Sequence, residues 1–232
     1  MRLDKFLADT TDLTRSLAKK ALHREEVSVD GQVTKNPATQ VDADSEVRWL
    51  GQPLVLVGMR YVMLNKPAGV ECSARRGLYP LVRELIALPN VERLQTVGRL
   101  DVDTTGLVLL SDDGQWSHRV TSPKRRCGKV YRVGLSEPLE GEALVEAQRR
   151  FADGVMLDAE DKPTRPAELD MRGPREAELT LYEGKYHQVK RMFAAIGNHV
   201  ETLHRESVGP LTLGELAPGE WRELTRDEVA AF

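Results

Sequence analysis

The stretch GRLDVDTTGLVLLSDDG, residues 98–114, constrains the fold of this chain more than any other. Its second half, LVLLS at 107–111, is a short apolar run that ends at Asp-Asp-Gly, and such a run predicts a buried strand. Asp101 follows Arg99 by two residues and precedes the apolar run by six, so we expect it on a loop leading into the sheet. An acid at such a place serves in a turn, as a metal ligand or in catalysis.

The pattern of the whole chain divides it into two parts. Residues 1–58 are typical of a small module, because helical periodicity at LDKFLADT and over 14–25 is followed by the extended pieces VSVDGQVT and SEVRWL. Asp30-Gly31 predicts a hairpin turn inside the first extended piece. The segment 51–60 carries Gly and Pro between two patterned regions, so we place the domain boundary there.

From Tyr61 onward, strands alternate with a few helices. Helices are predicted at 140–151 and 186–196, and strands at YVMLNK, LVLLS, KVYRVGL and EAELTLYEG. Thr225 and Glu228 have the spacing of a capping box and predict a short terminal helix. The sequence therefore predicts an α+β protein whose larger second domain covers residues 59–232.

Charge and cysteine content restrict the partners and the compartment. The formal net charge is only -3, so any nucleic-acid surface must be a local patch. No apolar stretch approaches the roughly 18 residues of a membrane-spanning helix, and the N-terminus lacks the apolar run of a signal peptide. Cys72 and Cys127 have neither zinc-binding nor redox spacing, which favours reduced thiols in a cytoplasmic protein.

One predicted helix, residues 14–25, separates its charges from its apolar side chains. A helical wheel puts its leucines and alanines on one side and a basic arc on the other, formed by Arg15, Lys19, Lys20, His23 and Arg24. Such an arc is either a solvated helix face or a phosphate-binding surface. The order of RLDKFLAD, this helix and the VSVDGQV hairpin resembles the S4 RNA-binding module. That resemblance implies that residues 1–58 bind RNA through the basic helix.

Three interpretations of the acidic loop are open to the sequence. A calcium-binding EF-hand loop fits the spacing of its acids, but that motif needs a helix on both sides, and a strand follows here. For Asp103, with its neighbouring threonines, we favour a turn role. Catalysis by Asp101 requires a nearby cation to keep the carboxylate charged. EGKYHQVKRMF at 183–193 supplies candidate cations, and Tyr131 in KVYRV supplies an aromatic ring.

Taken together, GRLDVDTTGLVLLSDDG, KVYRVGL and EGKYHQVKRMFAAIGNHV resemble the three characteristic segments of pseudouridine synthases. The chain is similar to the family of ribosomal small subunit pseudouridine synthase A. This resemblance also rests on the S4-like module and on the segments YVMLNKPAGV, DDGQWSHRVTSP and LHRESVG. The resemblance implies a catalytic domain with a mixed, mainly antiparallel sheet. It also implies catalytic roles for three residues: Asp101 as the carboxylate, Tyr131 as a ring stacked on the uracil, and Lys190 as a cation paired with Asp101.

The same resemblance assigns RNA contacts. Arg99 is expected to fill the gap left by an extruded uridine, or to contact phosphate. The segment 118–132 holds six basic residues and no acid, so it is expected to track the RNA backbone. The expected contacts are Arg15, Lys19, Lys20, Arg24, Arg99, Lys124, Arg125, Arg126, Lys129 and Arg191. His187 and Gln188 are expected to be scaffolding, and Lys66 receives no chemical step.

The implied reaction is the isomerisation of one uridine to pseudouridine in 16S rRNA, with uridine 516 as the expected target. Its substrate is either naked rRNA or a partly assembled small subunit. No cofactor and no metal is required, and a monomer is expected. The alternatives are a large-subunit 23S rRNA synthase of the same superfamily and a non-catalytic RNA-binding assembly factor.

Overall fold

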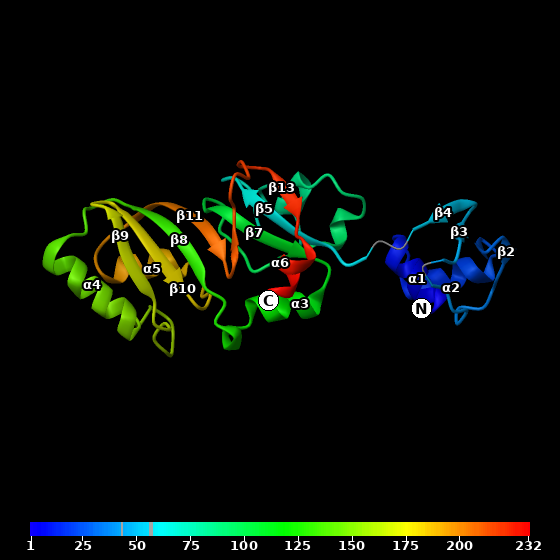
Figure 1. The fold of residues 1–232 in the computed structure, drawn as a ribbon, viewed down its shortest axis with the longest axis horizontal. Coiled ribbons are helices and arrows are strands. Elements are labelled where there is room, and N and C mark those ends of the chain that lie inside the picture. Colours follow the sequence, from blue (N-terminus) through cyan, green and yellow to red (C-terminus); the bar gives the residue numbers. More distant parts are fainter. Residues whose placement is uncertain (43, 56–57) are drawn as a thin grey trace. The chain divides into compact units, whose positions relative to one another are not determined.

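The computed structural model describes residues 1–42, 44–55 and 58–232. It divides the chain into two compact units, Met1–Gly58 and Met59–Phe232. Figure 1 shows the elements of each unit. None of the helices within the described residues is long and apolar enough to cross a membrane.

The first unit packs two helices on a small antiparallel sheet. Helix α1 spans Leu3–Thr10 and α2 spans Arg15–His23, where the Thr14 hydroxyl accepts a hydrogen bond from the Leu17 amide and caps α2. The sheet has the order β2-β1-β3-β4, with β1 at Val27–Val29, β2 at Gln32–Val33, β3 at Val47–Trp49 and β4 at Gln52–Leu54. Asp30 and Gly31 both have positive φ, as a two-residue hairpin turn requires. The predicted hairpin is therefore present.

The second unit is built on one mixed sheet of order β13-β5-β7-β11-β8-β10-β9, with β6 and β12 each paired to it. Among the described strands, β7 and β11 pair in parallel and the other neighbours are antiparallel. The predicted α+β class with a mixed, mainly antiparallel sheet is confirmed. The strands are β5 Tyr61–Lys66, β6 Gln95–Val97, β7 Thr105–Ser111, β8 Lys129–Leu135, β9 Glu168–Gly173, β10 Glu176–Leu181, β11 Val200–Val208, β12 Leu211–Thr212 and β13 Trp221–Glu223.

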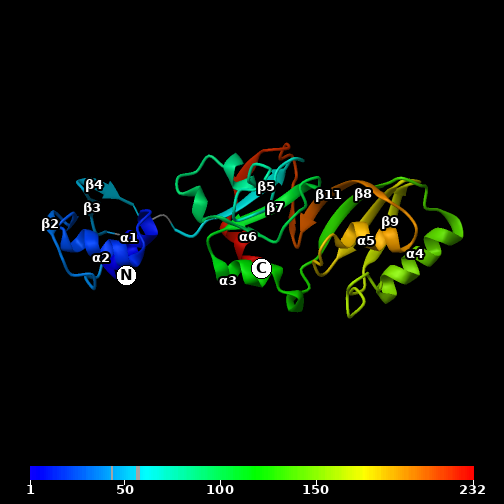
Figure 2. The same ribbon diagram turned by 180° about the vertical axis from the view of Figure 1, so that it is seen from behind.

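Helices cover the two halves of this sheet separately (Figures 1 and 2). Helix α4 (Gly141–Asp153) and α5 (Gln188–Ala195) lie by β8, β9 and β10, where Phe151 meets Phe193 edge to face with ring centroids 5.3 Å apart. Helix α3 (Gly114–Thr121) and α6 (Arg226–Ala230) lie by β5 and β7, around the buried Trp116. Short 3-10 turns occur at Val82–Leu85, Val91–Arg93 and Pro123–Arg125.

Helix α3 is a structure that the sequence reasoning missed. Asp113, interpreted above as part of a strand end, also caps this helix, because its carboxylate accepts hydrogen bonds from the Gln115 and Trp116 amides at 2.9 and 3.0 Å. The first residues of the basic segment 118–132 therefore belong to this helix. One Asp-Asp-Gly sequence ends β7 and begins α3, and both functions suit its composition.

The register of the sheet places four residues in one row across it. Lys66 of β5 lies opposite Gly106 of β7, Gly106 opposite Arg205 of β11, and Arg205 opposite Tyr131 of β8. Gly106 has φ of +107°, and a Cβ there would stand 2.3 Å from the Arg205 carbonyl oxygen. Only glycine allows β7 and β11 to approach this closely at the start of β7.

We predict that Gly106→Ala destabilises the second unit by at least about 2 kcal/mol, because the methyl group meets backbone and the φ value is unfavourable for alanine. Urea denaturation followed by circular dichroism measures this. Gly114→Ala is the matched control, since a Cβ at Gly114 meets nothing within 4 Å and φ there is not positive. Equal midpoints for the two variants would contradict the assigned close approach.

Candidate active site

Asp101 opens a tight turn that leads into β7. The Thr104 amide donates to the Asp101 carbonyl at 3.1 Å, and the Gly69 amide donates to the Val102 carbonyl at 2.9 Å. One hydrogen bond therefore closes the turn, and the other links it to the segment that follows β5. The Asp101 side chain remains about one third exposed, so it is accessible to a substrate.

A buried lysine forms hydrogen bonds to the backbone of this turn. Lys66 is fully buried, and its ammonium group donates to the carbonyls of Pro67, Val102 and Thr104 at 2.9, 3.2 and 2.8 Å. Burial lowers the pKa of Lys66, whereas the nearby Cys72, Asp103 and Asp101 oppose that shift. Three hydrogen bonds use all three donors of the ammonium group. The sequence gave Lys66 no chemical step, and the structure shows it positioning the backbone on both sides of Asp103.

The start of α5 faces the same turn. His187 Nε2 lies 3.3 Å from Asp101 Oδ1, and Lys190 Nζ lies 4.0 Å from Asp101 Oδ2. His187 precedes α5 with φ of 49°, a left-handed conformation that is uncommon outside glycine. The sequence assigned His187 to scaffolding, but its ring contacts Asp101 directly.

The closest partner of Lys190 differs from the expected one. Its ammonium group hydrogen-bonds both oxygens of Asp103 at 2.8 and 2.7 Å, and this bond is the main reason that the pKa of Asp103 is lowered. Asp103 stands in the same turn and is more exposed than Asp101, with 71% of its side chain accessible against 32%. Lys190 therefore bridges two carboxylates instead of pairing with Asp101 alone.

Tyr131 lies in the row that crosses the sheet from this turn. It is 8% exposed, and its hydroxyl is 3.5 Å from Nη1 of the buried Arg205. With a strand spacing of about 4.8 Å, Tyr131 lies roughly 10 Å across the sheet from Gly106. Arg205 also donates to the Leu107 carbonyl at 2.8 Å, while its Nη2 has no hydrogen-bond partner among the described residues.

Arg205 lies in the LHRESVG segment, and the sequence analysis assigned it no role. A charged residue in the alternating, half-buried strand β11 was the available signal, because arginine is seldom fully buried without a special function.

Two residues predicted to contact RNA, Arg191 and Lys129, are less exposed than the others. Arg191 donates to Glu160 at 3.1 Å, to the Tyr186 carbonyl at 3.0 Å and to the Asp158 carbonyl. Its guanidinium group thus donates hydrogen bonds to oxygens of the protein, which suits the several donors of an arginine side chain. Lys129 is only partly exposed, and burial lowers its pKa. Both side chains are partly exposed, so their RNA contacts stay predictions.

The other predicted contacts are exposed. Arg99 stands beside Asp101 and forms no ion pair within the described part of the chain. On the basic segment, Arg126 lies over the Tyr182 ring with 5.5 Å between guanidinium carbon and ring centroid. Exposed positions of the first unit and of the segment after α3 are Arg15, Lys19, Lys20, Arg24, Lys124, Arg125 and Arg126.

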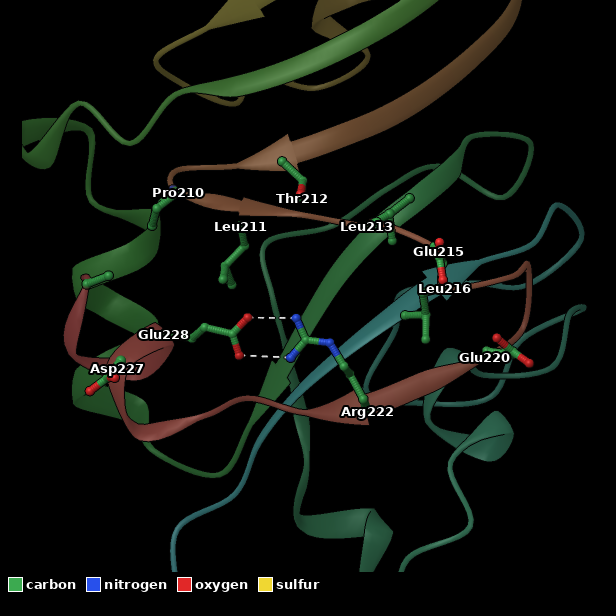
Figure 3. A pocket seen from close by; sticks show the side chains of 12 residues that line it. Pro210, Leu211, Thr212, Leu213, Glu215, Leu216, Glu220, Arg222, Asp227 and Glu228 are labelled. Carbon is green, nitrogen blue, oxygen red and sulfur yellow. Dashed lines mark hydrogen bonds and ion pairs between the residues drawn. The ribbon is translucent and has the colours of Figure 1, made fainter.

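A separate cavity of about 730 Å³ lies at the C-terminal end of the second unit (Figure 3). Leucines of the segment 211–216 line it, and Arg222 meets Glu228 across it in two hydrogen bonds of 2.8 and 2.6 Å. That pairing lowers the pKa of Glu228 to about 2. The cavity contains none of the predicted site residues. The described residues also contain no group of His, Cys, Asp and Glu arranged for a metal ion.

Comparison with known proteins indicates the family of this chain. Residues 60–195 match the model of the RNA pseudouridylate synthase family. Ribosomal small subunit pseudouridine synthase A of Yersinia pestis is 49% identical over 233 residues, covering 100% of this chain and 97% of its own. The protein of that name from Escherichia coli K12 is 46% identical over 233 residues, with coverages of 100% and 99%.

A crystal structure of a pseudouridylate synthase superposes with a TM-score of 0.70 and is 45% identical, covering 100% of this chain and 99% of that one. The Asp101 turn, Tyr131 and the start of α5 all lie within the residues that the family model matches. The chain therefore belongs to the RNA pseudouridylate synthase family, and it is an isomerase.

Proposed function

We propose that this chain converts one uridine of small-subunit 16S rRNA to pseudouridine, with Asp101 as the catalytic carboxylate. The observation that carries the proposal is the turn that holds Asp101 within reach of His187 and Lys190. The substrate is inferred from the names of full-length relatives at 46% and 49% identity. The expected position is uridine 516.

The reaction needs no change in oxidation state. The N1–C1′ bond of the uridine breaks, the uracil turns, and a C5–C1′ bond forms; C5 loses a proton and N1 ends with one. A carboxylate beside the sugar either adds to C1′ or removes a sugar proton, as carboxylates do in other glycosidic reactions. In both cases a negative Asp101 acts, and His187 and Lys190 at the start of α5 lie 3.3 and 4.0 Å from its carboxylate oxygens.

Tyr131 and Lys190 complete the proposed chemistry. The Tyr131 ring is proposed to stack on the uracil, and its hydroxyl, 3.5 Å from Arg205 Nη1, to take part in proton transfer. Lys190 supplies the positive charge between the two carboxylates of the turn, 2.7 Å from Asp103 and 4.0 Å from Asp101. Arg99, free beside Asp101, enters the RNA stack when the uridine leaves it, since a stacked base hides its C1′ side.

The first unit is proposed to be an S4-like RNA-binding domain. Its helix α2 buries Ala18, Ala21 and Leu22 and leaves its basic residues in solvent. Lysines and arginines in such a row bind RNA by releasing counterions from the phosphates. Lys124, Arg125 and Arg126 extend the proposed RNA contact in the second unit.

We predict that Asp101→Asn abolishes pseudouridine formation and leaves RNA affinity within a few fold, because the amide keeps the shape but not the charge. Carbodiimide labelling and primer extension on rRNA from a strain lacking this gene, complemented with wild type or Asp101→Asn, measure the reaction. Restoration of one 16S mark by wild type alone is the expected result. Restoration of a 23S mark would replace the substrate. Turnover by the variant would overturn the role of Asp101, and unchanged rRNA would favour the RNA-binding assembly factor.

We predict that Lys66→Met lowers turnover at least about tenfold while RNA affinity changes little. The methionine fills the buried space but donates no hydrogen bond, so the carbonyls of Val102 and Thr104 lose their partner. Single-turnover kinetics with saturating enzyme separate this effect from binding. Lys162→Met, an exposed lysine, is the control. Turnover equal to that of the control would show that the turn does not depend on Lys66.

We predict that the double variant Lys19→Glu with Lys20→Glu weakens RNA binding and reduces the slope of log affinity against log salt by about 1 to 2, as the loss of two phosphate contacts requires. Titrations at several salt concentrations measure the slope. The control, Lys162→Glu with Arg175→Glu, makes the same change of charge at exposed positions of the second unit. Equal slopes for wild type and the α2 variant would remove α2 from the RNA interface.

A further inference from the structure

Tyr186 is an exposed aromatic side chain beside the proposed catalytic turn, and its ring has no role in the proposed reaction. It is 70% exposed, so most of its surface faces solvent. One face of the ring is covered by His187, with ring centroids 3.8 Å apart and planes 20° from parallel. The same His187 lies 3.3 Å from Asp101. A flat aromatic surface therefore stands one residue away from the group that contacts the catalytic carboxylate.

The turn that carries Tyr186 is held on both sides. The Tyr186 carbonyl accepts a hydrogen bond from Arg191 Nη1 at 3.0 Å, and Arg191 is bonded to Glu160. Lys185 binds the other oxygen of Glu160 at 2.6 Å, and its amide donates to the Gln188 side chain at 2.8 Å. The backbone that carries the ring is thus held in place, which lowers the entropic cost of any contact that the ring makes.

The chemistry of this surface suits a nucleobase. An exposed tyrosine ring gains by stacking against another flat ring, and single-stranded RNA bases commonly stack on aromatic side chains in this way. When a uridine is extruded, the base next to it loses one stacking neighbour and needs a replacement.

We propose that Tyr186, backed by His187, is the stacking platform for the nucleobase adjacent to the target uridine. This inference rests on the proposed function, because it requires that a uridine be extruded at Asp101. Stacking there favours the open RNA conformation and fixes the backbone on one side of the reacting sugar. Tyr186 is then a binding residue for the flanking nucleotide, whereas Asp101 acts on the uridine itself.

The test compares Tyr186→Phe, which keeps the ring, with Tyr186→Leu, which keeps apolar bulk but has no aromatic face. Single-turnover kinetics are measured on an RNA fragment that contains the target uridine. We expect Tyr186→Phe to stay within about twofold of wild type and Tyr186→Leu to lose about tenfold, which corresponds to about 1.4 kcal/mol. Thermal melting of both variants should match wild type, since the side chain is exposed.

A second readout follows the flanking base directly. The fluorescent base analogue 2-aminopurine is placed on either side of the target uridine, and its quenching by wild type is compared with that by Tyr186→Leu. Loss of quenching at one flanking position, retained by Tyr186→Phe, is the expected result. Equal turnover and equal quenching for the leucine variant would overturn the inference. Lack of turnover by wild type on this RNA would instead overturn the proposed function.

Discussion

The buried ammonium group of Lys66 fixes the backbone on which the rest of the site depends. It donates to carbonyls on both sides of Asp103 and to its own neighbour Pro67, so the end of β5 and the Asp101 turn form one rigid piece. Burying an ammonium group is costly unless its N–H groups find hydrogen-bond acceptors. Here three backbone carbonyls accept those hydrogen bonds in place of a carboxylate. The result is a turn whose acids project outward while its backbone is anchored inward.

A second constraint sets where the other groups of the site lie. Since Gly106 permits β7 and β11 to run side by side, Arg205 and Tyr131 follow in register across the sheet. Helix α5 packs on the same half of the sheet through Phe193 and directs its first residues to the turn. Asp101 and Lys190 are 89 residues apart in the chain, yet the turn before β7 and the start of α5 bring their charged groups within 4.0 Å.

Four basic residues of the motifs differ in their surroundings. Lys66 is buried and bonded to backbone, Lys190 is half-buried and bonded to Asp103, and Arg191 is bonded to Glu160. Arg99 is exposed beside the turn. All four are basic residues of motifs in the sequence, and their burial and partners distinguish those that shape the site from the one that is open to RNA.

The sequence by itself determined the local structure: the apolar run of β7, the Asp30-Gly31 hairpin, the helices after residue 140 and after residue 187, and the Thr225–Glu228 capping box. Its motifs also indicated the family and the candidate residues, because those rest on residue types at short spacings. Only the tertiary structure decided the partners. These partners depend on which strands lie side by side. Examples are the pairing of Lys190 with Asp103, the contact of His187 with Asp101, the burial of Lys66 and Arg205, and the hydrogen bonds of Arg191 within the protein. Such neighbours are set by packing over the whole sheet, and no local pattern of residues contains that information.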